Sequence, residues 1–287
     1  GGIECDLTVT RLAEDSYFIV TSAATAARDF DWIKRHIPDD ARAQLSDVTS
    51  AWGVLSVMGP DARALLSKVT DADLSNRAFP YLSAQEIAVG YAPARALRVT
   101  YVGELGWELY VPTEFMVGAY QSILEAGQGN GLAHVGYHAL DSLRSEKGYR
   151  HWGHEIGLED SPIEAGLGFA VAFDKNSPFI GRDALLRQRE SRPTRRLVQF
   201  ALHDPEPLLY HDEPIWRDGE LVGRITSGSY GHTLGRAVGM GYVRSESGVD
   251  AAFVRAGRFE VEIAGARHPA TPHFSPPYDP KGERIRA

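Results

Sequence analysis

Two acidic residues stand where the sequence predicts strands, and both could do chemistry. Asp6 lies within the alternating run Cys5–Thr10, on the side opposite the apolar residues, although aspartate is disfavoured in strands. It is either a solvated carboxylate or a carboxylate directed into a cavity, where it could stabilise a cation or accept a proton. The sequence leaves both interpretations of Asp6 open.

Glu108 and Tyr101 flank a short turn, Gly103–Gly106, so a hairpin there would bring their side chains close together. An ionised carboxylate can accept two parallel hydrogen bonds from a planar pair of N–H groups. The amidine and guanidine edges of pterin and guanine rings present such a pair. Glu108 therefore either binds a ligand of this kind or is an ordinary surface residue of a strand.

Three potential metal ligands crowd the short segment His151–Glu155. A zinc site holds its ligands on a fixed frame, as in the pattern His-Glu-x-x-His on one helix face. Here Gly153 and the helix end expected at Gly148 predict a loop. We therefore expect histidines that are hydrogen-bonded to the backbone, and no metal site.

The chain has a single cysteine, Cys5, so it cannot form a disulfide within itself. A cysteine acts as a nucleophile only when a base lies beside it, which sequence cannot show. Its place in line with Leu7 and Val9 predicts packing instead. The low cysteine content favours a reducing compartment, the cytoplasm or the mitochondrial matrix of a eukaryote.

Composition excludes several classes of protein. The chain has 287 residues and a formal net charge of −8, so it is a poor general binder of nucleic acid. No apolar run approaches the roughly 20 residues that a membrane helix needs. Neither a phosphate-binding loop nor a dinucleotide-binding glycine motif follows a predicted strand. We therefore expect no nucleic-acid or membrane partner and no nucleotide or flavin site in the chain itself.

Hydrophobic periodicity predicts strands mixed with helices over the first two thirds of the chain. The expected elements are strands over 5–10, 17–22, 52–58, 97–101 and 107–111, and helices over 26–37, 61–69 and 116–124, with a further helix that ends at Gly148. Antiparallel strands mixed with helices in this way are typical of an α+β fold.

The last third has a different pattern. Strands are expected over 196–202, 236–243 and 259–263, and Asp218-Gly219 between two apolar pairs is a strong hairpin signal. Helical patterns are scarce there, which predicts an all-β domain. The basic segment Arg187–Arg195 separates the parts, so we expect a first region over 1–190 and a second over 195–287.

Several long motifs, in the same order, resemble one family over essentially the whole chain. They are the runs Gly1–Leu7, Tyr101–Tyr110, Asp141–Lys147, Pro162–Leu167, Phe179–Arg182 and Thr226–Gly228. The chain resembles the folate-binding aminomethyltransferases, typified by the T-protein of the glycine cleavage system. The runs Glu104–Glu108 and Glu146–Gly153 are closer to one branch, the C-terminal half of flavin-dependent dimethylglycine and sarcosine dehydrogenases and oxidases.

The resemblance implies a T-protein-like folate-binding body followed by a C-terminal antiparallel β-barrel. Members of this family begin before the position that matches Gly1, so the resemblance implies a body truncated at its N-terminus and a chain that is a fragment. In the dehydrogenase branch a flavin-binding domain lies upstream. We therefore expect FAD only in such an upstream partner domain, and no amine oxidation by this chain alone.

The resemblance also implies roles for single residues. Asp6 matches the catalytic aspartate near the folate amine nitrogens, and Glu108 matches the glutamate that clamps the pterin, with Tyr101 beside it. The remaining residues that the family would place against tetrahydrofolate are Phe18, Val20 and Ser22 on the second strand, and Phe169.

The function implied is capture of a one-carbon unit, released by oxidation of an N-methyl amine, by tetrahydrofolate to give 5,10-methylenetetrahydrofolate. Its small-molecule partners are then the folate and the one-carbon donor. Four alternatives stay open at this point. They are an aminomethyltransferase of the glycine-cleavage type, a relative that removes methyl groups from sulfur or oxygen, a folate-binding scaffold without catalysis, and a fragment whose pocket is left open by truncation and binds no ligand.

Overall fold

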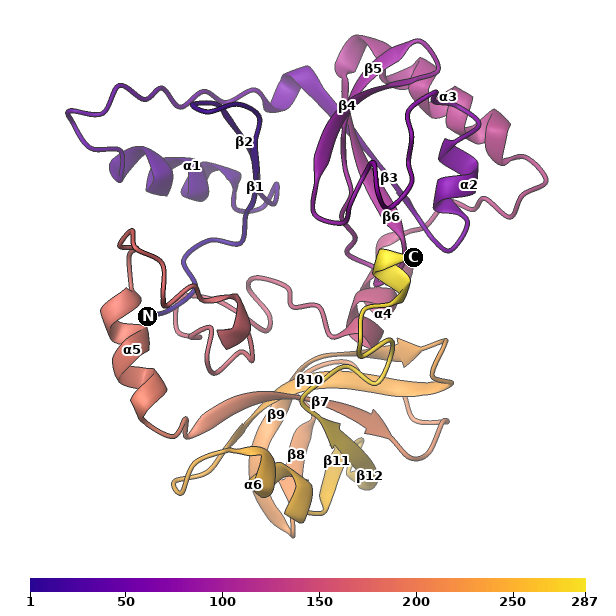
Figure 1. Cartoon of the computed structure of the whole chain (residues 1–287). Coiled ribbons are helices and arrows are strands. Elements are labelled where there is room, and N and C mark those ends of the chain that lie inside the picture. The colour runs from indigo at the N-terminus through magenta and orange to yellow at the C-terminus, as the bar shows by residue number, and fades with distance from the viewer. The chain divides into compact units, whose positions relative to one another are not determined.

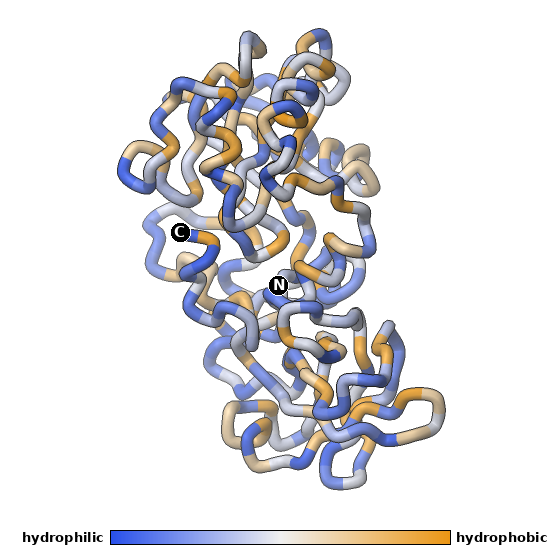
Figure 2. The backbone as a smooth tube through the Cα atoms, turned by 90° about the vertical axis from the view of Figure 1, so that its right-hand side faces the viewer, coloured by the Kyte–Doolittle hydropathy of each residue, from blue (hydrophilic) through white to orange (hydrophobic).

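The computed structural model describes all 287 residues, which divide into two compact units (Figure 1). The barrel unit comprises Gly1–Glu4 and Val135–Lys281, and the sheet unit comprises Cys5–His134 and Gly282–Ala287. Apolar and polar segments alternate along the whole backbone in Figure 2, and no helix is both long and apolar enough to cross a membrane.

The barrel unit contains a closed barrel of six strands in the order β10-β7-β12-β11-β8-β9, with every neighbouring pair antiparallel. Phe200, Ile215 and Val261 are fully buried among its core residues. The strands are β7 (Arg195–Leu202), β8 (Pro214–Arg217), β9 (Glu220–Gly231), β10 (Arg236–Arg244), β11 (Phe259–Ile263) and β12 (Ala266–His273).

The expected hairpin at Asp218-Gly219 joins β8 to β9, and both residues have positive φ, 51° and 90°. The structure adds a short helix, α6 (Ala251–Ala256), that the sequence analysis did not predict. Its start is fixed by the Asp250 carboxylate, which accepts a hydrogen bond from Phe253 N at 2.8 Å.

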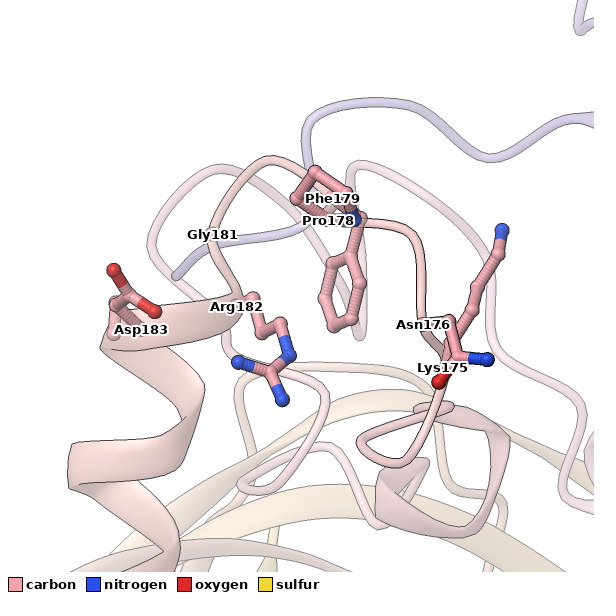
Figure 3. Close-up of a pocket in the computed structure, with 8 residues that line it drawn as sticks. Lys175, Asn176, Pro178, Phe179, Gly181, Arg182 and Asp183 are labelled. Atoms are coloured by element: carbon pink, nitrogen blue, oxygen red, sulfur yellow. The ribbon is translucent and has the colours of Figure 1, made fainter.

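Before the barrel, helix α5 (Arg182–Glu190) follows Gly181, and a short 3-10 turn, η3, spans Gly168–Ala170. The guanidinium of Arg182 turns back beneath the preceding loop and donates to Phe173 O at 3.0 Å (Figure 3). This bond ties the first turn of α5 to the loop that leads into it.

Helix α4 (Tyr137–Lys147) packs against β9 and β10 with polar side chains rather than an apolar face. Arg144 is 2% exposed and donates to Glu155 Oε2 at 2.8 Å and to Ser227 Oγ at 3.0 Å. Glu146 accepts from the backbone N–H groups of Thr233 and Leu234 at 2.9 and 2.8 Å. The charged motif of this helix is therefore part of its attachment to the barrel.

Gly148 ends α4 as expected, in the left-handed conformation with φ +67°. A Cβ atom there would lie 2.8 Å from Oε1 of Gln199, whose amide donates to Ser145 O at 2.7 Å. Glycine is thus favoured at this position by the backbone conformation, and a larger residue would also displace the Gln199 side chain.

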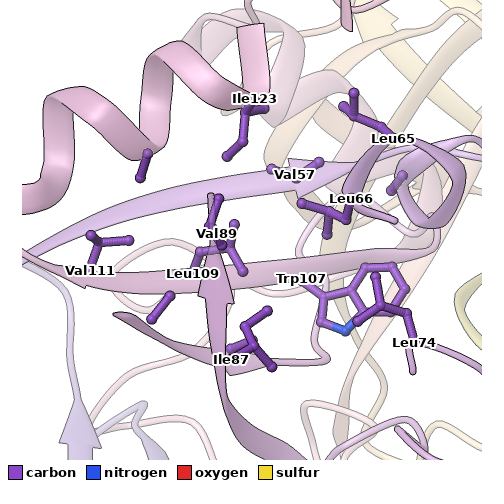
Figure 4. Close-up of a cluster of buried hydrophobic side chains, with 14 of the residues drawn as sticks. Val57, Leu65, Leu66, Leu74, Ile87, Val89, Trp107, Leu109, Val111 and Ile123 are labelled. Atoms are coloured by element: carbon purple, nitrogen blue, oxygen red, sulfur yellow. The ribbon is translucent and has the colours of Figure 1, made fainter. Parts of the chain in front are cut away.

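The sheet unit is built on a four-stranded antiparallel sheet in the order β3-β6-β5-β4. Its strands are β3 (Trp52–Met58), β4 (Ala84–Val89), β5 (Ala92–Leu97) and β6 (Gly106–Pro112). One face carries Trp107, Leu109 and Val111, all fully buried (Figure 4). Helices α2 (Ala62–Leu66) and α3 (Met116–Gly127) cover that face.

Two arginines of the sheet unit donate hydrogen bonds to its C-terminal residue. Arg63 and Arg98 both donate to Ala287 O, at 2.7 and 3.0 Å, and both guanidinium groups lie within 6 Å of the Trp107 ring, at 5.7 and 5.5 Å. Asn76 donates to Arg286 O at 3.0 Å. These bonds hold the segment 282–287 against the sheet unit.

A two-stranded ribbon, β1 (Thr8–Arg11) and β2 (Tyr17–Val20), precedes helix α1 (Ala26–Arg35). Asp29 of α1 is 1% exposed and accepts hydrogen bonds from Thr21 and Thr25. Burial acts to raise the pKa of Asp29, but these hydroxyls, the Cys5 thiol and Arg28 hold it below its usual range. This carboxylate anchors the ribbon to the helix.

The α+β class and the C-terminal barrel are confirmed. Several strand boundaries were wrong, two of them with consequences for the site. The first strand begins at Thr8, not Cys5, and Val9, expected on an apolar face, is 57% exposed. The strand expected through Tyr101 ends at Leu97 because Val99 N turns back to Leu97 O at 3.0 Å. The division of the chain into regions 1–190 and 195–287 stays a prediction.

We predict that Arg144→Met lowers the free energy of unfolding by about 3–5 kcal/mol, because it leaves the buried Glu155 carboxylate without its cation. Chemical denaturation monitored by circular dichroism measures this. The double variant Arg144→Met/Glu155→Met is the control and should lose less than the single variant. A loss below about 1 kcal/mol in the single variant would contradict the assignment, because breaking a buried pair costs more than that.

Candidate functional site

Glu108 lies on the face of the sheet opposite the apolar core. In β6 it stands between Ser56 of β3 and Leu97 of β5, while its neighbours Trp107 and Leu109 point to the buried face. Its side chain is half-buried. The alternation of β6 therefore places one carboxylate on a surface that is partly shielded from water.

Tyr110 is the partner of this carboxylate. It lies two residues further along β6, on the same face, and its hydroxyl donates to Glu108 Oε2 at 2.6 Å. Tyr110 is 2% exposed. Burial, and then the negative charge of Glu108, raise the pKa of the Tyr110 phenol well above its ordinary value. Tyr110 is thus a neutral hydrogen-bond donor that fixes one oxygen of Glu108.

Phe18 of β2 packs on this same face. Its ring lies edge-on to Tyr110 and Trp52, with centroids 5.2 and 5.7 Å apart. The Arg95 guanidinium lies 4.7 Å from the centre of the Phe18 ring and donates to Glu86 Oε1 at 2.7 Å. The edge-to-face rings and the Arg95 cation cover one side of the Glu108–Tyr110 pair.

Val20, another predicted site residue, lies beside Phe18 on the ribbon. Thr8 pairs with Val20 and Thr10 with Phe18, so Val20 and Phe18 share one face of the ribbon. Asp6 precedes β1 by two residues, Ser22 follows β2 by two, and both are exposed. Neither is held in the strand ladder.

Of the predicted site residues, the structure brings Phe18 and Glu108 together through Tyr110. Tyr101 is half-buried in the irregular segment between β5 and β6. Phe169 belongs to the barrel unit, in η3, and is 87% exposed. The roles given to all seven residues, including Asp6, Val20 and Ser22, stay predictions.

The sequence analysis missed Tyr110, Trp52 and Arg95. A signal for the first was present, because a tyrosine two positions after a glutamate in a strand must share its face. Trp52 and Arg95 could not be found in this way, since they come from two other strands whose pairing the sequence did not reveal.

In the segment His151–Glu155, the Glu155 carboxylate is hydrogen-bonded to other residues of the barrel unit. Glu155 is fully buried and accepts from Arg144, from His151 N at 2.9 Å and from Thr226 Oγ1 at 3.2 Å. The rings of His151 and His154 lie 4.6 Å apart. Burial, together with the charges of His154 and Arg144, lowers the pKa of His151. This arrangement is that of a structural network in the barrel unit.

Comparison with protein-family models matches two parts of the chain. Residues 1–175 match the GCVT N-terminal domain, and residues 195–279 match the glycine cleavage T-protein C-terminal barrel domain. In the solved structure of the glycine cleavage system aminomethyltransferase T from Bartonella henselae, 71% of the chain aligns with 95% of this one, at a TM-score of 0.80 and 26% identity.

Curated relatives are longer. The chain is 46% identical to 4-methylaminobutanoate oxidase (formaldehyde-forming) of Paenarthrobacter nicotinovorans, over 99% of this chain and 34% of that protein. It is 38% identical to the mitochondrial sarcosine dehydrogenase of Homo sapiens, over 100% of this chain and 33% of that protein. The chain thus spans about a third of the length of these two relatives.

We predict that Glu108→Gln lowers the pKa of Tyr110, because it removes the charge and the charged acceptor while burial remains. Titration of ¹³C-labelled tyrosines by NMR toward high pH measures this. Tyr242 of the barrel unit is the internal control, because burial also raises its pKa but Glu108 is not among the causes. An unchanged Tyr110 titration would show that the two side chains do not form the 2.6 Å bond in solution.

Proposed function

The chain belongs to the glycine cleavage T-protein family, and from this membership and the Glu108 site we propose that it binds tetrahydrofolate and transfers a one-carbon unit to it. The product would be 5,10-methylenetetrahydrofolate. The observation that carries the proposal is a half-buried carboxylate, fixed at one oxygen by Tyr110, on the sheet face opposite helices α2 and α3.

Glu108 would hold the pterin. A carboxylate has about four acceptor sites, and Tyr110 uses one of them, so enough remain for the two parallel N–H groups of the pterin edge. The bond from Tyr110 fixes the orientation of the carboxylate before the ligand arrives, which reduces the entropy lost on binding. Phe18 and Val20 would give apolar contact from the ribbon, and Tyr101, Ser22 and Phe169 the further contacts implied by the family.

Asp6 would act on the reacting nitrogens. Tetrahydrofolate supplies the nucleophilic nitrogens that take up a one-carbon unit at the oxidation level of formaldehyde. Uptake develops positive charge at nitrogen and then requires loss of a proton. An ionised Asp6 side chain near these atoms would stabilise that charge and accept the proton.

The one-carbon donor would be an N-methyl amine that a flavin-dependent partner domain oxidises. Sarcosine dehydrogenase, and an oxidase described as formaldehyde-forming, are the relatives that support this donor class. FAD belongs to that partner domain in our proposal, and no residue of this chain is assigned to it. We propose a location in the cytoplasm, or in the mitochondrial matrix in a eukaryote.

Aminomethyl transfer of the glycine-cleavage type is the second candidate. The similarity to aminomethyltransferase T, at 26% identity and a TM-score of 0.80, supports it. Both candidates use the same folate site and differ in the donor. Supplying an aminomethylated carrier protein or an oxidised N-methyl amine to the same preparation would distinguish them.

We predict that Glu108→Gln weakens tetrahydrofolate binding by about 1.5–3 kcal/mol, the usual contribution of hydrogen bonds to a charged group. Isothermal titration calorimetry measures this loss, which corresponds to roughly 10- to 150-fold in Kd. Glu125→Gln is the matched control, because Glu125 is exposed and lies on α3, which covers the opposite face of the sheet. Equal affinities of the two variants would remove Glu108 from the proposal.

We predict that Asp6→Asn slows one-carbon transfer but leaves folate binding nearly unchanged. The substitution keeps the size and removes the charge, so folate affinity should change little while one-carbon capture slows by about 10²-fold. Methylenetetrahydrofolate formation is measured beside amine oxidation in the protein that includes the flavin domain. Unchanged capture would leave Asp6 without a catalytic role and favour a folate-binding scaffold.

A further inference from the structure

A concave site lies within the barrel unit, whereas Glu108 belongs to the sheet unit. It is a groove of about 570 Å³ formed by parts of the segment 163–175, by Arg189 near the end of α5 and by the start of β7. Three cationic side chains line it, Lys175, Arg189 and Arg196, against one carboxylate, Asp174. The groove therefore carries a net positive charge.

None of these three cations has a carboxylate partner, in contrast to the neighbouring Arg195. Arg195, beside the groove, bonds to Asp160 and Glu164 at 2.7 and 3.3 Å. Lys175, Arg189 and Arg196 form no ion pair within the chain. The positive charge of the groove is thus uncompensated, although acidic residues outnumber basic ones in the sequence by 38 to 30.

Of the three cations, Arg196 is the one whose surroundings most clearly lack a counter-charge. Its Nε atom is buried and has no hydrogen-bond partner, and its guanidinium lies 4.9 Å from the centre of the Phe274 ring. Burial lowers the pKa of this side chain, with no neighbouring negative charge to offset the effect. A desolvated cation without a counter-charge is unfavourable, and an anion in the groove would offset that cost.

The other half of the lining is apolar. Ile163, Val171 and Pro193 contribute aliphatic surface, and Phe173 contributes a ring with the Arg189 guanidinium 4.8 Å from its centre. A small hydrated ion such as phosphate would leave this surface uncovered. A carboxylate with an apolar body would bury it and could form paired hydrogen bonds with a guanidinium.

We propose that this groove binds an organic carboxylate with an aromatic or other apolar body, whose charge is held by Arg196 together with Lys175 and Arg189. The inference concerns residues of the barrel unit alone and does not rest on the pterin site at Glu108. The ligand could be the aryl-glutamate part of a folate or a free carboxylate, and the two sources share the chemistry that the groove recognises.

The test is calorimetric titration of the chain at low salt with three probes: p-aminobenzoylglutamate, sarcosine and inorganic phosphate. We expect p-aminobenzoylglutamate to bind more tightly than the other two. Arg196→Gln should weaken it by about tenfold or more, the usual effect of losing charged hydrogen bonds. Arg192→Gln is the matched control, because Arg192 does not line the groove and its side chain is 76% exposed, so affinity should stay within about twofold.

A second substitution shows whether the loss of affinity in Arg196→Gln comes from misfolding. Arg189 is exposed, so Arg189→Gln should keep the thermal unfolding midpoint of the parent chain and still weaken the probe. Glu108→Gln should leave probe binding unchanged, which separates this inference from the proposed function. The inference is overturned if phosphate or sarcosine binds as tightly as p-aminobenzoylglutamate. Folded Arg196→Gln and Arg189→Gln that both keep full affinity would also overturn it.

Discussion

The buried guanidinium of Arg144 is the interaction on which the barrel unit depends most. It joins helix α4, the loop that holds Glu155 and strand β9 through one set of hydrogen bonds, with both charged partners at 2% exposure or less. Removing either partner would leave a buried charge, which costs far more than the pair itself contributes. Residues of the motif that carries the family resemblance, Asp141–Lys147, therefore act here as structural residues, since their polar atoms are used in attaching the helix to the barrel.

In the sheet unit, the two faces of the sheet have different roles: one forms the hydrophobic core and the other carries the candidate site. Its apolar face is sealed by α2 and α3, and its stability comes from burying Trp107, Leu109 and Val111. The opposite face is therefore available for polar residues. Glu108 and Tyr110 lie there two positions apart, and Phe18 from the ribbon shields one end of the pair. The core and the candidate site thus both depend on β6, because alternate residues of this strand point to opposite faces of the sheet.

Charge is used differently in the two units. Near Glu108 a single carboxylate is oriented by a neutral donor, which suits recognition of an uncharged N–H edge. In the groove of the barrel unit three cations lack partners and adjoin apolar surface, which suits an anion with an apolar body. The two sites can be tested separately because they lie on different units.

The sequence by itself determined the α+β class, the all-β last third, the Asp218-Gly219 hairpin and the glycine that ends α4, because each depends on local periodicity or on a residue with special backbone freedom. The closure of the last third into a barrel was implied by the family resemblance. The sequence also indicated Glu108, through the resemblance and the turn beside it. Only the tertiary structure decided that Tyr110 fixes Glu108, that Phe18 and Arg95 shield the pair, and that the first strand starts at Thr8. The same is true of Arg196, whose uncompensated charge depends on residues far apart in the chain. Hydrogen-bond partners and desolvation are set by which strands pair and which surfaces meet, and a single sequence does not specify those long-range contacts.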